Sequence, residues 1–145
     1  LAAGIVETFG HYDLPQPAQL VLVSPMLDIS MRNPQIHEYF DIDPVLAPWG
    51  IAQIGDLWAD GDDVTLPRLS PINGDVSILR IVGTREIFYP DCVKWDEKLE
   101  AAGINHKLVV GVGLNHNWPL SPIPEARVAR KQIAGIVGAG AKGVR

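Results

Sequence analysis

The chain has 145 residues, of which 47% are hydrophobic and 20% are charged, a composition typical of a folded globular domain. Its formal net charge is -5 and its basic residues form no run, so nucleic-acid binding is not expected. No apolar stretch approaches the roughly 20 residues of a membrane span, and no signal-peptide pattern is present. Because Cys92 is the only cysteine, an intrachain disulfide is excluded and a cytoplasmic protein is favoured.

The first half of the chain predicts a helix, a strand and an irregular segment. Leu1–Phe9 is apolar and compatible with a helix. Gln19–Val23 is a short apolar run bounded by prolines, as expected of a strand buried on both faces. The segment 31–74 is rich in prolines and aromatics and predicts a cap-like insertion over the sheet, with short helices around Pro44–Gly50 and Ile51–Trp58.

The second half alternates strands and helices. Ser77–Val82 predicts a second buried strand, and Asp91 is the expected N-cap of a helix that ends at Gly103. His106–Val110 predicts a third strand, which a glycine-rich loop follows.

The last element is an amphipathic helix from about Glu125 to Val137, followed by a flexible tail at 138–145. Strands that alternate with helices are typical of an α/β fold with a mostly parallel sheet and helices on both of its faces. We expect residues 1–145 to form a single domain that is only partial, because this length is short for a fold of this class.

Two polar loops follow the second and third predicted strands. The first carries Glu86 and the second carries His116. Because the carboxyl ends of parallel strands meet at one edge of a sheet, a carboxylate and an imidazole are expected there together. In serine hydrolases such an imidazole takes the proton of the serine hydroxyl and the carboxylate orients the imidazole. The chain order, acid and then histidine, is that of α/β-hydrolases.

Several short motifs, in this order and spacing, resemble the C-terminal half of the hormone-sensitive-lipase-like branch of α/β-hydrolases. They are Leu22-Val23-Ser24-Pro25-Met26-Leu27-Asp28-Ile29-Ser30, Leu69-Ser70-Pro71-Ile72, Val82-Gly83-Thr84-Arg85-Glu86-Ile87, Ala101-Ala102-Gly103, His116-Asn117-Trp118 and Pro124-Glu125-Ala126. The resemblance implies an esterase or lipase that acts on a small-molecule ester without a metal or organic cofactor. It also implies that Glu86 is the acid and His116 the general base of a catalytic triad.

The nucleophile of that family is not found in the chain. Its serine stands in a Gly-x-Ser-x-Gly turn, and none of the five serines has such neighbours. The start, Leu1-Ala2-Ala3-Gly4, resembles the helix that follows this turn in the family. We therefore expect the serine a few residues before Leu1, a missing N-terminal half, and no hydrolysis by this chain alone.

Other assignments of the polar residues remain open. Asp91 is the rival acid, although helix capping is the more common role at its position. Glu86 and His116 could be ordinary polar loop residues, and Cys92 could be a nucleophile, although it follows the acid in the chain. Trp118 is a candidate for lining a substrate pocket.

The alternative function is a non-catalytic binding or interaction module that retains half of a hydrolase fold. A small parallel sheet without flanking strands exposes unpaired edges, which favours association. We therefore expect the chain to associate with itself or with a missing N-terminal half.

Overall fold

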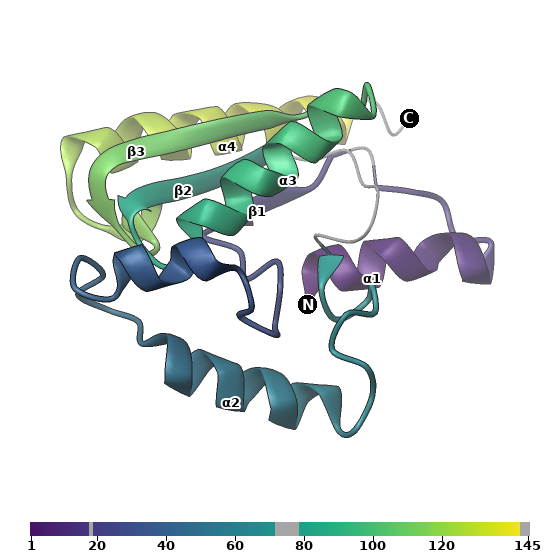
Figure 1. Cartoon of the computed structure of the whole chain (residues 1–145). Helices are drawn as coiled ribbons and strands as arrows, with labels where there is room; N and C mark the ends of the chain where they lie inside the picture. The colour runs from purple at the N-terminus through teal and green to yellow at the C-terminus, as the bar shows by residue number, and fades with distance from the viewer. Residues whose placement is uncertain (18, 72–78, 143–145) are drawn as a thin grey trace.

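A computed structural model describes residues 1–17, 19–71 and 79–142, with side chains to residue 138. Its centre is a parallel sheet in the order β1-β2-β3 (Figure 1), formed by β1 (Val21–Val23), β2 (Leu79–Arg85) and β3 (Lys107–Asn115). The register pairs Ile81 of β2 with Val23 on one side and with Val109 on the other. The predicted parallel α/β fold is confirmed.

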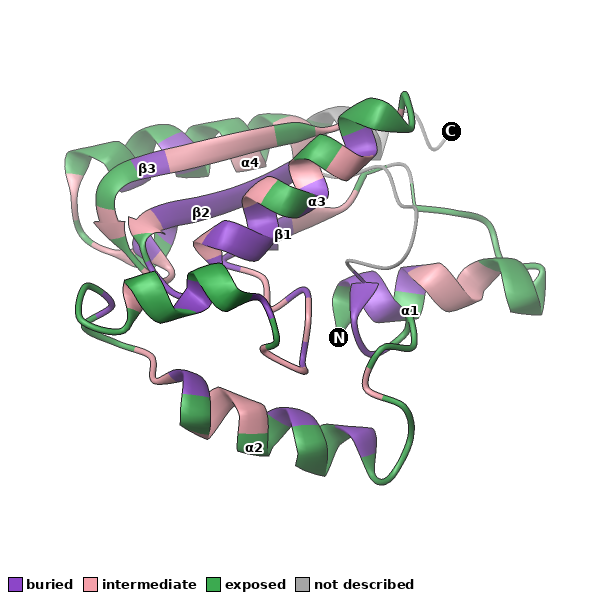
Figure 2. Ribbon diagram, viewed as in Figure 1, coloured by how far each residue is buried: buried purple, intermediate pink, exposed green. Residues whose placement is uncertain are grey.

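Helices cover both faces of this sheet. On one face lies α3 (Tyr89–Ala101), and on the other lies α4 (Pro124–Lys142) (Figure 1). The helix α1 (Ala2–Thr8) contributes Ala3 and Val6 to the core on the α3 side. The first face buries a cluster that includes Val6, Val82 and Trp95, and the second buries Ile81 against Ala126. The buried colour of β2 in Figure 2 follows from this arrangement, because apolar side chains leave the strand in both directions.

The strands extend further than predicted. β2 continues to Arg85 and β3 continues to Asn115, so the glycines expected in a loop belong to the strand. Gly83 pairs with Gly111, and a bulge separates this pair from the pairing of Arg85 with Asn115. The strands approach so closely here that a Cβ on Gly83 would lie 2.2 Å from the Leu114 carbonyl oxygen, which explains a glycine inside a strand. Predicted strand residues 77 and 78 lie outside the described residues.

Two helix ends differ from the predictions. α3 begins at Tyr89 with Phe88 as its N-cap, so Asp91 lies in the first turn and is not the cap. Pro90 favours the earlier start, because proline suits the first turn of a helix. α4 continues past Gly138 to Lys142, since a glycine in a helix costs only about 1 kcal/mol relative to alanine, and Ala139 and Ala141 follow it here.

Within its described residues, 31–71, the cap-like segment contains one α-helix where two short helices were expected. The helix is α2 (Pro48–Ala59), and it follows the 3-10 helix η2 (Pro34–Tyr39). Proline at the start of α2 and a turn held by the Asp43 carboxylate explain why the helix does not begin at residue 44. Further short helices are η1 (Phe9–Tyr12) and η4 (Trp118–Leu120). The cap function of the segment stays a prediction.

Candidate active site

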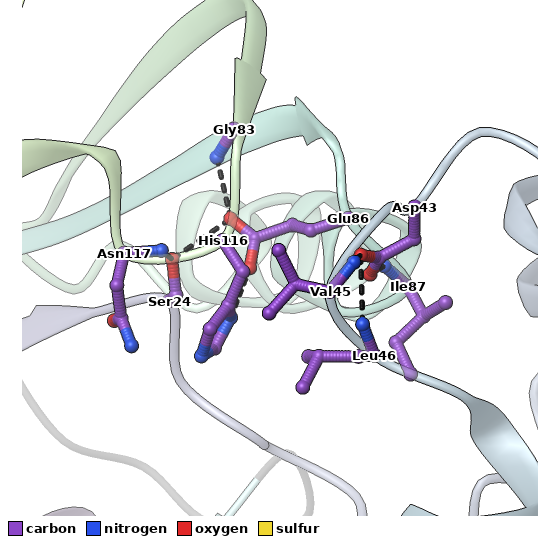
Figure 3. Close-up of polar contacts among 9 residues, drawn as sticks. All are labelled: Ser24, Asp43, Val45, Leu46, Gly83, Glu86, Ile87, His116 and Asn117. Atoms are coloured by element: carbon purple, nitrogen blue, oxygen red, sulfur yellow. Dashed lines mark hydrogen bonds and ion pairs between the residues drawn. The ribbon is translucent and has the colours of Figure 1, made fainter. Parts of the chain in front are cut away.

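Three polar side chains meet at the carboxyl edge of the sheet (Figure 3). Ser24 follows β1, Glu86 follows β2 and His116 follows β3. Each strand therefore delivers one residue to the same place, which is the usual position of functional groups in an open parallel sheet.

Glu86 and His116 form a hydrogen-bonded pair. Oε2 of Glu86 lies 2.7 Å from Nδ1 of His116. When a carboxylate is ionised it can only accept hydrogen bonds, and this contact then requires the proton of the ring on Nδ1. The Glu86 side chain is fully buried and the His116 side chain is 16% exposed. The imidazole of His116 also packs edge-to-face against the ring of Phe88. The predicted meeting of the two side chains is thus observed.

The second carboxylate oxygen of Glu86 is also fixed. Oε1 accepts the backbone N–H of Gly83 at 2.6 Å and the hydroxyl of Ser24 at 2.8 Å. With His116 on the other oxygen, three donors surround this buried carboxylate. Its rotation is therefore restricted before any substrate binds.

Two residues of this network were not predicted. The Ser24 hydroxyl accepts the backbone N–H of Asn117 at 2.9 Å, and Asp43 accepts the backbone N–H of Ile87 at 2.8 Å. Ser24 stands in one of the motifs that resemble the family, but the sequence assigns it no role, and Asp43 is only one of many acids. No local signal indicates either contact.

The rival residues lie in different surroundings. Asp91 accepts the Asn33 side-chain amide at 2.7 Å, and burial raises its pKa to about 6. Cys92 is fully buried, and this burial is the main reason that the pKa of its thiol is raised. The nearby charge of Glu86 raises the same pKa further. The thiolate is the nucleophilic form of cysteine, so this burial disfavours a nucleophilic Cys92.

Trp118 packs in the core between the sheet and α4. Its side chain is 5% exposed and belongs to the cluster that contains Leu79 and Ala129. A Cβ on Gly111 would lie 2.6 Å from the Trp118 ring nitrogen, so this glycine makes room for the indole. The packing gives Trp118 a structural role, and its part in substrate binding stays a prediction.

Among the described residues, no group of three His, Cys, Asp or Glu side chains is placed to hold a metal ion. In the same part of the chain, no helix combines the length and the apolar character that a membrane span requires.

A family model for the alpha/beta hydrolase fold matches residues 1–120. The chain belongs to the α/β-hydrolase fold family. The predicted resemblance is therefore confirmed at the level of this family.

Solved structures agree with this membership. A crystal structure described as "a putative esterase from Staphylococcus aureus" is 30% identical, with a TM-score of 0.88, and the match covers 94% of this chain and 48% of that one. EstE5 is 25% identical with a TM-score of 0.87, over 95% of this chain and 49% of that one. A hormone-sensitive lipase from a metagenome library, 24% identical with a TM-score of 0.87, shares the fold over 95% of this chain and 48% of that one.

The chain spans about half the length of the structures that it matches. No curated protein sequence matches it.

Proposed function

We propose that this chain supplies the acid and the base of a serine-dependent carboxylic-ester hydrolase of the hormone-sensitive-lipase-like branch. The observation that carries the proposal is the 2.7 Å contact between the buried Glu86 carboxylate and Nδ1 of His116. Membership of the hydrolase family and similarity to a structure described as an esterase support it.

In this mechanism the pair activates a serine that the 145 residues do not include. Because Nδ1 faces Glu86, Nε2 is the nitrogen available to accept the proton of the serine hydroxyl. The hydroxyl oxygen then attacks the ester carbonyl, and His116 returns the proton to the departing alcohol. Glu86 holds the ring in the required tautomer and stabilises the imidazolium. No metal or organic cofactor takes part in these steps.

The substrate class is a small-molecule ester. The serine is proposed to lie in a Gly-x-Ser-x-Gly turn shortly before Leu1, and the similarity of Leu1-Ala2-Ala3-Gly4 to the helix after this turn supports the proposal. The first test is therefore to extend the coding sequence upstream of Leu1 and read it for this motif.

The second test measures hydrolysis of p-nitrophenyl butyrate by the extended protein. We expect Glu86→Ala and His116→Ala each to lower kcat by about 10³-fold or more, as losses of triad members do. Glu38→Ala and His11→Ala remove exposed residues of the same types and should leave kcat unchanged.

Four results would count against this assignment. Near-normal kcat in Glu86→Ala would remove Glu86 as the acid, and loss of kcat in Asp91→Asn with an intact fold would favour its rival. Hydrolysis by the 145-residue chain alone would contradict an upstream nucleophile. An extended protein that binds esters without cleaving them would instead indicate the non-catalytic module.

A further inference from the structure

Ser24 occupies the centre of the three loops at the carboxyl edge of the sheet (Figure 3). Its backbone N–H donates to the Ile81 carbonyl oxygen at 2.7 Å, which fixes the residue to β2. Its side chain then contacts the loop of Glu86 and the loop of His116 at once. Only 4% of Ser24 is exposed, so water does not readily replace these contacts.

The two hydrogen bonds use the Ser24 hydroxyl in both directions. Its single proton goes to Oε1 of Glu86, and its oxygen accepts the N–H of Asn117. A serine nucleophile would have to donate that proton to the histidine. The Ser24 hydroxyl instead donates its proton to the carboxylate of Glu86, so its hydrogen bonds are those of a residue that positions Glu86 and not those of a nucleophile.

The backbone at Ser24 adopts a conformation that is rare for residues other than glycine. Its φ is +45°, in the left-handed region, and Pro25 follows it. A residue before proline normally adopts an extended conformation, and a side chain at positive φ is strained. Surrounding contacts must maintain such a conformation, and strained residues concentrate near functional sites.

We propose that Ser24 is a positioning residue that joins the acid and base loops and holds the Glu86 carboxylate in the rotation that presents Oε2 to His116. Its catalytic meaning rests on the proposed function above. Without the hydroxyl, Oε1 keeps only the Gly83 donor and the N–H of Asn117 loses its acceptor. The carboxylate then has more freedom to turn, and the preference of His116 for a proton on Nδ1 weakens.

The test reads the tautomer of His116 in the 145-residue chain by two-bond ¹H–¹⁵N NMR of the imidazole ring. In the wild-type chain we expect neutral His116 to carry its proton mainly on Nδ1. In Ser24→Ala and in Ser24→Gly, the ratio of the Nδ1–H to the Nε2–H tautomer should fall about tenfold, since a hydrogen bond to a charged group is lost.

The two variants separate the hydroxyl from the backbone. Glycine relieves the strain at positive φ, so a purely conformational role predicts the wild-type ratio in Ser24→Gly and a change only in Ser24→Ala. If Ser24→Ala does not fold, as judged from its backbone amide spectrum, Ser24→Gly decides alone. Ser121→Ala is the matched control, because the Ser121 hydroxyl makes no hydrogen bond with the described residues, and it should keep the wild-type ratio.

An unchanged ratio in Ser24→Gly would overturn the proposal whatever Ser24→Ala shows, and so would a wild-type His116 that carries its proton mainly on Nε2. The readout requires no substrate. A changed tautomer in a protein without esterase activity would therefore leave the positioning role intact and reject the proposed function alone.

Discussion

The Asp91 carboxylate is buried in the first turn of α3 without a full set of partners. Its Oδ1 accepts the Asn33 amide, whereas Oδ2 has no partner among the described residues. Burial is the main reason that its pKa rises to about 6, opposed by the Asn33 hydrogen bond, with Asp28 raising it further and Lys94 lowering it. Position in the first turn of a helix favours a negative charge, but the loss of hydration outweighs this effect here.

This carboxylate makes the stability of the fold depend on pH. Between the unfolded pKa of about 4 and the folded pKa of about 6, the folded state binds one more proton than the unfolded state. The free energy of unfolding should therefore fall as pH rises through this window, by an amount on the order of 2 kcal/mol. Above the folded pKa, Asp91 should cause no further decrease in the free energy of unfolding.

We expect Asp91→Asn to remove this loss. Urea unfolding at pH 4 and at pH 7 should show the variant gaining stability over the wild type as pH rises, because asparagine stays neutral. Glu97→Gln, which neutralises an exposed acid on the same helix, serves as the control. A difference between Asp91→Asn and wild type that is the same at both pH values would contradict the raised pKa.

At the residue scale the sequence predicts the pair but not its supports. Glu86 and His116 were found because each directly follows a strand whose apolar pattern is clear. Ser24 contacts Glu86 across 62 positions of sequence and Asn117 across 93, and Asp43 contacts Ile87 across 44. Contacts at such separations depend on how the loops converge in the fold, which no local spacing encodes.

At the element scale, Asp43 connects the segment before α2 to the acid loop. Its Oδ1 accepts the backbone N–H groups of Val45 and Leu46, and its Oδ2 accepts that of Ile87, the residue after Glu86 (Figure 3). One carboxylate therefore holds both a turn of the 31–74 segment and the loop that carries the acid.

We expect Asp43→Asn to break the second connection while keeping the first. The retained amide oxygen can still accept from Val45 and Leu46, but the amide nitrogen cannot accept from Ile87. The free energy of unfolding should fall by about 1 to 3 kcal/mol, since a buried N–H loses its acceptor. Hydrogen exchange at the Ile87 amide should accelerate by about tenfold or more.

Asp41→Asn, which alters an exposed acid two positions away, should leave both the stability and the Ile87 exchange rate unchanged. Equal protection of the Ile87 amide in Asp43→Asn and wild type would show that Asp43 does not hold the acid loop.

The elements themselves were predicted where one pattern dominates, and missed where packing decides. The three strands follow from apolar runs, but the extension of β3 through Gly111 and Gly113 to Asn115 depends on its pairing with β2. Arg80 is a further example, because it is fully buried in β2, where it pairs with Asp96 and stacks over Trp95. A lone arginine in an apolar run gives no indication of such partners.

At the scale of the whole molecule, the described sheet leaves β1 and β3 each with a neighbour on one side only. In addition, α2 exposes a group of large apolar side chains on its outer surface, as the exposed colour along this helix in Figure 2 illustrates. They are Trp49, Ile54, Leu57 and Trp58, with exposed fractions of 70%, 54%, 81% and 53%. Contiguous apolar surface and unpaired strand edges both favour association.

We predict that the 145-residue chain associates with itself, so that its apparent mass in sedimentation velocity rises with concentration over the micromolar range. Each apolar square ångström removed from water contributes about 25 cal/mol, so the α2 surface is expected to supply much of the driving force. Leu57→Lys and Trp49→Lys should shift the association to higher concentration. Gln53→Lys adds the same charge at an exposed position of α2 and should have a smaller effect, because it removes little apolar surface. A sharp monomeric boundary across the whole range would contradict self-association, whereas association that is equally strong in all three variants would place the contact on the strand edges.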